Sequence, residues 1–258
     1  MMKRQIKALK PFLQGLMVCA VLLVGIESVF GEKLKPDFPP RDRGLIVSIL
    51  HTLGPLIKDK QRSGSAPLLS WSELIQPLDT KQFVLIERFR RFSGATGDDD
   101  ETQPPLVRLD NQSISKNGQA KLIPPQYVTR TVYDAYTRMS QSMQYDLGTT
   151  LRIESGYRSP AYQLYLYLSH LSRYQFNMAK TNRHVALPGQ SEHGSLQNPA
   201  IDLINAAGIN GDYNPKKFTL LPEYRWLTLN AEVYGFKPSF PEATIDSAFE
   251  PWHWRYCQ

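Results

Sequence analysis

Between residues 44 and 60, apolar side chains recur every three or four positions, which is the spacing of one face of a helix. Pro55 lies inside this stretch and predicts either a kink or the end of the helix's first part. A helix on a membrane surface or against a partner has the same pattern, but packing on the chain's own core is the commoner outcome. We therefore expect a core helix whose apolar face consists of Leu45, Ile46, Ile49, Leu50, Leu53, Leu56 and Ile57.

The second half of the chain is patterned more tightly. Residues 127–144 follow two prolines and predict a helix, which Gly148 ends. The inner face of this helix is expected to consist of Val128, Val132, Ala135, Tyr136, Met139 and Met143. The other predicted elements are short helical or mixed segments at 70–78 and 80–91, a small hairpin region at 107–120 with Asn117-Gly118 as its turn, strands at 149–154 and 200–204, and a helix near 160–174.

The N-terminal residues read as a targeting segment rather than as part of the fold. Lys3, Arg4, Lys7 and Lys10 precede an apolar stretch at 13–26, and a small-residue cleavage site follows at 29–31. The stretch is shorter than the roughly 20 residues of a full membrane span, which favours a cleaved signal peptide over an uncleaved anchor. Cleavage would remove Cys19 and leave only Cys257, so no internal disulfide is expected.

Charge and composition exclude some classes of function. The net charge is +6, of which residues 1–31 supply half, and the remainder is too weak and too scattered to favour nucleic-acid binding. Residues 32–43 are rich in proline and charge and predict a linker. The acidic run at 98–101 lacks the ligand alternation of an EF-hand, which favours a solvated loop. At 258 residues, one domain is favoured over two.

Two histidine-containing clusters carry the candidate chemistry. His193 and Asp202 follow a Pro-Gly corner, and Glu250 and His253 lie near the chain end among Trp252, Trp254 and Tyr256. A single histidine of this kind is more often structural than metal-binding. Two imidazoles and one carboxylate together are a common ligand set of catalytic zinc, and a spare glutamate can serve as acid or base for a water there. We therefore predict a zinc hydrolase.

Local geometry gives further expectations about these residues. If the segment after the Pro-Gly corner is extended, Ser191 and His193 point the same way. Glu250 and His253 share a face only if the chain bends, and Pro251 favours such a bend. Arg158 lies between a predicted strand and a predicted helix N-terminus, a position suited to anions, although a surface arginine without a role remains open. His51, His170 and His184 are expected to be exposed or core histidines.

These motifs carry a resemblance to a known family. The chain reads SGYRS at 155–159, PGQSEH at 188–193, AID at 200–202 and EPWHWRY at 250–256. In motif order it resembles the zinc D-alanyl-D-alanine carboxypeptidases of the vancomycin-resistance type, the LAS group of peptidases, over roughly residues 123–256. Here the interval between His193 and Asp202 is two residues longer than the family pattern, which we interpret as a two-residue insertion in the loop 194–199 that leaves both ligands in place.

The resemblance implies a fold and a set of residue roles. The fold is α+β, a small mainly antiparallel sheet that carries a zinc site and is flanked by helices, as in hedgehog and D,D-peptidase domains. One Zn²⁺ ion would be bound by His193, Asp202 and His253. Glu250 would be the general base that activates the zinc-bound water and passes the proton to the leaving amine. Arg158 would bind the developing oxyanion or the substrate carboxylate, and Ser191 and Gln163 would line the substrate site.

The implied function is removal of the terminal D-alanine from peptidoglycan stem peptides by a monomer exported to the periplasm or cell envelope, which contacts a membrane only through an uncleaved N-terminus. An L,D-carboxypeptidase, a D,D-dipeptidase or an L-alanyl-D-glutamate endopeptidase remains open, as does a zinc-containing binding module such as the hedgehog signalling domain. The presence of both Glu250 and Arg158 favours the enzyme. The expected organisation is a targeting segment at 1–31, an extension that packs on the domain at 32–122, and a catalytic domain at 123–258.

Overall fold

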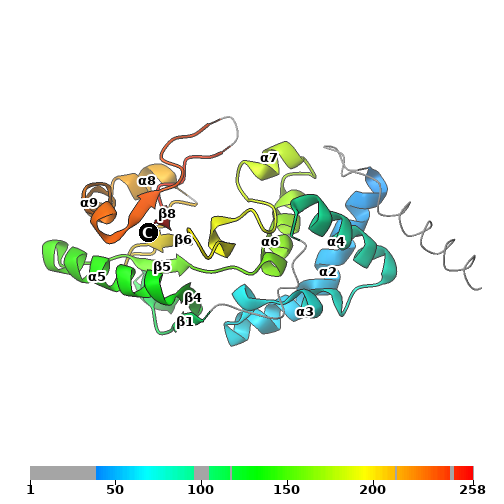
Figure 1. The fold of residues 1–258 in the computed structure, drawn as a ribbon, viewed down its shortest axis with the longest axis horizontal. Helices are drawn as coiled ribbons and strands as arrows, with labels where there is room; N and C mark the ends of the chain where they lie inside the picture. The colour runs from blue at the N-terminus through cyan, green and yellow to red at the C-terminus, as the bar shows by residue number, and fades with distance from the viewer. Residues whose placement is uncertain (1–38, 96–104, 117, 213, 245–246, 258) are drawn as a thin grey trace, which may run out of the picture.

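The computed structural model describes residues 39–95, 105–116, 118–212, 214–244 and 247–257. The fold is α+β, as predicted: one group of helices gathers at one end of the molecule, and a small antiparallel sheet lies at the other end together with the remaining helices (Figure 1). The helices are α2 (Pro40–Ser63), α3 (Trp71–Ile75), α4 (Thr80–Ser93), α5 (Arg130–Leu147), α6 (Pro160–Arg173), α7 (Met178–Asn182), α8 (Pro215–Thr219) and α9 (Pro222–Asn230), with 3-10 turns η1 (Ala66–Leu68), η2 (Glu192–Gly194) and η3 (Ala231–Tyr234). The strands are β1 (Leu106–Leu109), β2 (Ser113–Lys116), β3 (Gln119–Leu122), β4 (Gln126–Thr129), β5 (Arg152–Ser155), β6 (Ala200–Ile204), β7 (Phe236–Pro238) and β8 (His253–Tyr256).

The main sheet has four strands in the order β5-β6-β8-β7, and every neighbouring pair is antiparallel. The register places Asp202 of β6 opposite His253 of β8 on one side and opposite Ser155 of β5 on the other. All five residues of β6 are buried. This central strand therefore fixes the relative positions of polar residues that are up to 100 positions apart in the chain.

Helix α5 covers the sheet with the apolar face predicted from its periodicity. Val132, Ala135, Tyr136, Met139 and Met143 are all buried, and they share one core cluster with Ile153, Ile201, Leu203, Phe218, Trp226 and Trp254. The amphipathic pattern of this helix was thus a reliable guide to its orientation.

The predicted start of that helix at residue 127 is wrong. Residues 126–129 form β4, which pairs with β1 in an antiparallel ladder, and the helix begins only at Arg130. Thr129 ends the strand in an extended conformation, and its hydroxyl accepts a hydrogen bond from the Val132 amide as an N-cap. Pairing with a distant strand has overridden the local helical pattern of Tyr127 and Val128.

The elements α2, η1, α3 and α4 pack around α6, and together these four elements form the helical unit. Ile46, Ile49, Leu53 and Ile57 of α2 are buried on the predicted face, and they pack in a second core cluster with Leu164, Tyr167, Leu168 and Leu171 of α6. Pro55 lies inside α2 without ending it. The predicted linker at 32–43 is wrong from Pro40 onward, because Pro40 occupies the first turn of α2, where its fixed φ suits a helix and its missing amide hydrogen is not needed.

The helical unit also binds the segment that leads into α6. The Ser159 amide donates to the carbonyl of Pro67 at 2.8 Å, and the Ser159 hydroxyl donates to the carbonyl of Leu69 at 2.6 Å. Ser159 is the N-cap of α6 and directly follows Arg158. The end of η1, Pro67–Leu69, therefore holds the backbone next to that arginine.

Of the remaining predictions, some are confirmed, one is shifted along the chain, and others lie outside the described residues. The hairpin is present as β2 paired with β3, and Gly118 of its turn has a left-handed φ of 76°, but Asn117 lies outside the described residues. The strand predicted at 149–154 is β5, shifted to Arg152–Ser155, while α6 and β6 lie where the pattern predicts them. The targeting segment and the acidic run at 98–101 also lie outside the described residues. In the part of the chain that is described, no helix combines the length and apolarity needed to cross a membrane.

Packing of α4 against α6 can be tested with two phenylalanines of one helix. The Phe89 side chain is fully buried and meets the Tyr167 ring edge-on, with the ring centroids 6.0 Å apart. The Phe92 side chain is 48% exposed. We expect Phe89→Ala to lower the free energy of unfolding by about 3–5 kcal/mol, because it leaves a cavity in the core. Phe92→Ala should change it by about 0.5 kcal/mol or less. Denaturant unfolding of both variants checks this, and equal losses would mean that α4 does not pack as described.

Candidate metal centre

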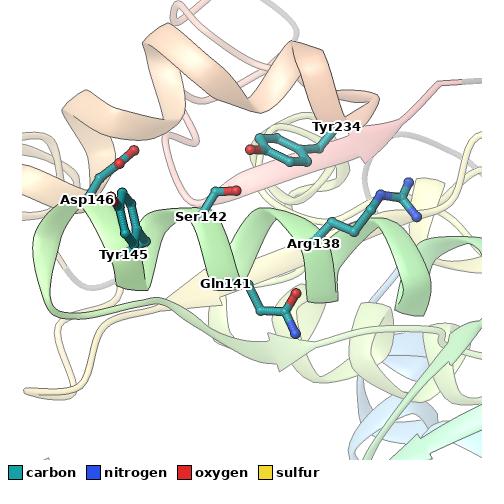
Figure 2. A pocket seen from close by; sticks show the side chains of 6 residues that line it. All are labelled: Arg138, Gln141, Ser142, Tyr145, Asp146 and Tyr234. Atoms are coloured by element: carbon teal, nitrogen blue, oxygen red, sulfur yellow. The ribbon is translucent and has the colours of Figure 1, made fainter.

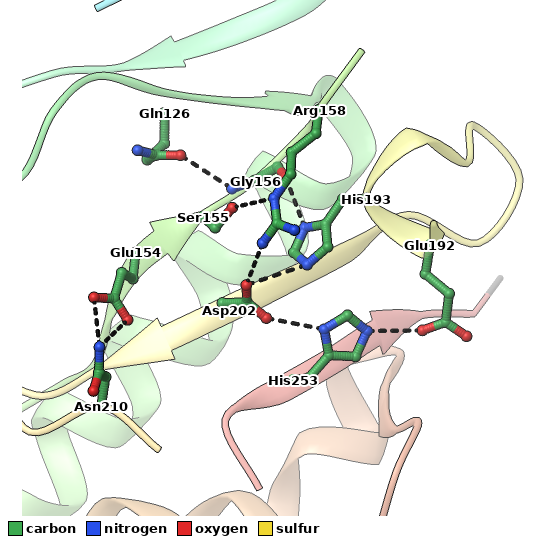
Figure 3. A network of polar contacts seen from close by, with 10 residues as sticks. All are labelled: Gln126, Glu154, Ser155, Gly156, Arg158, Glu192, His193, Asp202, Asn210 and His253. Atoms are coloured by element: carbon green, nitrogen blue, oxygen red, sulfur yellow. Dashed lines mark hydrogen bonds and ion pairs between the residues drawn. The ribbon is translucent and has the colours of Figure 1, made fainter. Parts of the chain in front are cut away.

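Three potential metal ligands meet at the centre of the main sheet. Asp202 comes from β6, His253 begins β8, and His193 lies in the turn η2 that passes beside them (Figure 3). One ligand atom from each lies within 4.8 Å of the other two, and all three side chains are buried. The cross-strand pairing of Asp202 with His253 sets one edge of this triangle.

The ring of His193 is oriented by a backbone carbonyl. Its Nδ1 lies 2.8 Å from the carbonyl oxygen of Gly156, and since a carbonyl can only accept, Nδ1 carries the proton. Nε2 therefore faces the cluster and lies 3.2 Å from Oδ2 of Asp202. The Gly156 position admits no side chain, because a Cβ there would lie 2.2 Å from the carbonyl oxygen of Tyr127.

The ring of His253 lies between two carboxylates. Its Nδ1 is 2.9 Å from Oδ1 of Asp202, and its Nε2 is 2.9 Å from Oε2 of Glu192. The two histidine rings meet edge-on with their centroids 4.9 Å apart. The inward-facing atoms of the cluster are thus Nε2 of His193, the carboxylate of Asp202 and Nδ1 of His253.

Burial and neighbouring charges shift the pKa values of these three residues in different directions. Burial, aided by the positive charge of Arg158, lowers the pKa of His193 to about 4, so this imidazole is neutral at pH 7. Burial opposes protonation of His253, yet its hydrogen bonds to Asp202 and Glu192 raise its pKa to about 9. Burial alone would raise the pKa of Asp202, but His193, His253 and Arg158 hold it well below its ordinary value. Asp202 is therefore an anion across the physiological range.

This donor set fits a zinc ion. Zinc prefers imidazole nitrogens and carboxylate oxygens in tetrahedral geometry, and catalytic sites use three protein ligands with a fourth position left for water or substrate. His193 and His253 each have their outer nitrogen occupied by a hydrogen-bond acceptor, as is usual for metal-binding histidines. The cluster also opens on a cavity of about 800 Å³.

All seven site residues proposed from the sequence line this one cavity. Besides the three cluster residues they are Arg158, Gln163, Ser191 and Glu250. Two cavity residues that the sequence did not single out, Gln61 and Pro67, come from the helical unit. The helical unit therefore forms part of the cavity wall.

Arg158 is held inside the site by two side chains. Its Nη2 donates to Oδ2 of Asp202 at 2.7 Å and its Nε donates to Oγ of Ser155 at 2.9 Å (Figure 3). Its amide donates to the carbonyl of His193 at 3.1 Å. These contacts argue against a surface arginine without a role.

Glu250 reaches the cavity because the chain turns before β8. The Glu250 amide donates to the carbonyl of Phe240, and the His253 amide donates to the carbonyl of Glu250, both at 3.1 Å. Residues Pro251 and Trp252 form the turn, as the bend expected at Pro251 requires. Burial raises the pKa of Glu250 to about 7 against the opposing effect of His253, so this carboxyl can exchange a proton near neutral pH.

The segment around His193 is not extended, so the condition under which Ser191 and His193 would point the same way is not met. Residues 192–194 form the 3-10 turn η2, so Ser191 and His193 are not related as residues i and i+2 on one face of a strand. Both residues nevertheless line the cavity. The longer loop after η2 closes on itself, with the Asn198 amide donating to the Ser195 hydroxyl, and β6 begins at Ala200.

Sequence reasoning missed several residues of the polar network. Glu192 contacts His253 although it lies 61 positions away. Gln126 accepts a hydrogen bond from the Gly156 amide at 3.2 Å, and the Asn210 side-chain amide donates to both oxygens of Glu154 at 2.8 and 3.0 Å. Only Glu192 had a signal, because it directly precedes His193 inside the motif.

Neither a second hollow nor the histidines outside the cluster provide a comparable set of ligands in the described residues. A second hollow of about 500 Å³ is lined by α5 residues and Tyr234, and it contains no histidine and no metal cluster (Figure 2). Its carboxylate, Asp146, already accepts a hydrogen bond from the indole of Trp226 at 2.7 Å. His170 and His184 line the main cavity but do not belong to the ligand cluster.

Comparison with known proteins gives one match to a family and several to solved structures. A family model described as VanY, D-alanyl-D-alanine carboxypeptidase, matches residues 125–258. Among solved structures, the vancomycin-resistance D,D-pentapeptidase VanY from a VanB-type cassette, in complex with Zn(II), is 22% identical, with 62% of this chain and 82% of that chain covered and a TM-score of 0.45. The LD-carboxypeptidase LdcB is 24% identical, with 60% and 70% covered and a TM-score of 0.44. DacB from Streptococcus pneumoniae D39 is 23% identical, with 58% and 84% covered and a TM-score of 0.37. A search of curated proteins found no match.

We expect the purified protein to bind about one zinc ion per chain through the buried cluster. His193→Ala and His253→Ala should each lose most of the metal, since each removes one of three protein ligands. His184→Ala is the matched control, because this histidine lines the cavity outside the cluster and should leave the zinc content unchanged. Atomic absorption after exhaustive dialysis checks the result. Full zinc content in both cluster variants would mean that the metal is held elsewhere.

Proposed function

This chain belongs to the VanY family of D-alanyl-D-alanine carboxypeptidases, and we propose that it is a zinc metallopeptidase that removes the terminal D-alanine from peptidoglycan stem peptides. The observation that carries the proposal is the buried cluster of His193, Asp202 and His253 at the wall of a large cavity. All three residues lie in the segment that matches the family model. Because peptidoglycan lies outside the cytoplasmic membrane, the proposal includes export of the chain.

The cluster residues supply the metal-binding part of the mechanism. His193 through Nε2, Asp202 through its carboxylate and His253 through Nδ1 would hold the ion. A zinc ion bound there would lower the pKa of a water molecule towards about 7 and polarise the scissile carbonyl. Every other step depends on groups of the chain itself.

Glu250 is proposed as the general base. Its carboxyl lines the same cavity as the cluster, and its raised pKa allows it both to take a proton from the attacking water and to return it to the leaving amine nitrogen. A binding module that does not hydrolyse its ligand has no need for a titratable carboxyl at this place. Glu250 therefore favours an enzyme over a zinc-containing binding module.

Arg158 is proposed to stabilise negative charge on the substrate. Its guanidinium is fixed by Asp202 and Ser155 at the edge of the cluster, so its remaining donor capacity is oriented before the substrate arrives. A fixed donor next to the carbonyl oxygen is effective because it needs no reorganisation as charge develops. The substrate carboxylate is the other group that Arg158 could bind.

Ser191 and Gln163 are proposed to contact the substrate peptide. The Gln163 side chain is 2% exposed, and its Nε2 donates to the carbonyl of Ala186 at 2.8 Å. Its Oε1 has no hydrogen-bond partner within the described structure. A buried acceptor of this kind is costly unless a ligand donates to it, and a peptide N–H is such a donor.

The role of Glu250 can be separated from metal binding. Glu250→Gln leaves the three proposed ligands intact, so we expect zinc content to stay near one ion per chain while release of D-alanine from a pentapeptide stem falls by at least about 100-fold. Zinc analysis and a D-alanine assay on the same preparation check both parts. Turnover equal to that of the parent would exclude Glu250 as the base. If the parent binds zinc but releases no D-alanine, tetrapeptides and cross-linked stems become the substrates to test.

The contribution of Arg158 is predicted to be electrostatic. Arg158→Ala removes one positively charged donor, and we expect kcat/KM to fall by about 100- to 1,000-fold. The zinc content should not decrease, because removal of a positive charge beside Asp202 does not weaken cation binding. Steady-state kinetics and metal analysis check this. A rate like that of the parent would mean that Arg158 does not act on the substrate.

A further inference from the structure

Glu192 contacts the ring of His253 on the side away from the cluster. The two residues come from different elements, η2 and β8, and Oε2 of Glu192 lies 2.9 Å from Nε2 of His253 (Figure 3). The opposite ring atom, Nδ1, faces Asp202 at 2.9 Å. Each nitrogen of this histidine therefore has a different partner, one inside the cluster and one outside it.

The Glu192 carboxylate is itself held in place. The Ser239 hydroxyl donates to the same oxygen, Oε2, that faces His253. Nη1 of Arg255 lies 3.5 Å from the other oxygen, Oε1. The Phe240 ring packs against the His253 ring with centroids 5.3 Å apart. Contacts from the β7–β8 connection and from β8 thus fix both the carboxylate and the imidazole that it touches.

The two histidines of the cluster are oriented by different means. For His193 the outer partner is the carbonyl of Gly156, which belongs to the backbone and is present whatever the side chains are. For His253 the outer partner is a side chain, Glu192. A neutral imidazole can carry its proton on either nitrogen, and the hydrogen bond made by one nitrogen decides whether the other is free to bind a metal.

We propose that Glu192 is a positioning residue, which accepts the Nε2 proton of His253 and thereby holds the ring in the tautomer and orientation that present Nδ1 to the metal. This inference rests on the zinc centre of the proposed function. It assigns a role to the residue between Ser191 and His193, which is not one of the three proposed ligands. Glu192 is not proposed to touch the substrate.

The first test measures zinc affinity by competition with a chromophoric chelator. Glu192→Ala should bind zinc about 10- to 100-fold more weakly than the parent, the usual effect of losing the outer partner of a metal-binding histidine. Glu192→Gln keeps an oxygen that can accept the Nε2 proton, so its loss should be clearly smaller. Asp212→Asn is the control for charge, because Asp212 lines the same cavity outside the cluster. Its zinc affinity should stay close to that of the parent.

The second test observes the ring directly. In the zinc-loaded parent, nitrogen-15 NMR of labelled histidines should show His253 protonated at Nε2 and metal-bound at Nδ1. In Glu192→Ala the Nε2 proton should exchange faster with solvent. Ser239→Ala, which removes only the hydroxyl bonded to Glu192, should produce a smaller change in the same direction. A role in stability alone would lower the unfolding temperature of the metal-free variants without separating Gln from Ala in zinc affinity.

The outcomes distinguish this inference from the proposal on which it rests. A parent protein that binds no zinc would overturn both. A parent that binds zinc, with Glu192→Ala matching it in affinity and in the His253 spectrum, would overturn the role of Glu192 and leave the zinc centre standing. Equal losses in Glu192→Ala and Asp212→Asn would show a general effect of charge, and would also contradict the positioning role.

Discussion

The antiparallel pairing of β6 with β8 is the constraint on which the site depends. It places Asp202 directly opposite His253, and the same residue pairs with Ser155 of β5 on the other side. A slip of one residue would turn these side chains to opposite faces of the sheet, since side chains alternate along a strand. The complete burial of β6 and the α5 face packed on the same core make such a slip unfavourable. The apolar core therefore fixes the geometry of the polar cluster.

A second constraint comes from outside the segment that matches the family model. The end of η1, Pro67–Leu69, holds the N-cap of α6 through Ser159, and this cap adjoins the arginine that pairs with Asp202. The helical unit also contributes Gln61 and Pro67 to the cavity wall. We propose that the helical unit is required for activity, because it supports the backbone of Arg158 and shapes the cavity that the substrate enters.

Local patterns predicted the strongly amphipathic helices α2 and α5, and the motifs together with the family resemblance predicted the site residues that line the cavity. They failed where a distant partner decides the outcome. Tyr127 belongs to a strand because β1 pairs with it, and Glu192 acquires its role only through a residue 61 positions away. Such long-range pairing has no period that a single sequence displays. The turn η2, by contrast, is closed locally, by a hydrogen bond from the Gly194 amide to the carbonyl of Ser191.

The central claim is that a metal ion is bound between Nε2 of His193, the Asp202 carboxylate and Nδ1 of His253. Anomalous X-ray diffraction from crystals of the zinc-loaded protein, recorded on both sides of the zinc absorption edge, tests it most directly. The account predicts one strong peak per chain, about 2.0–2.2 Å from each of these three groups. A peak held by other residues, or no peak in protein that binds zinc in solution, would contradict it.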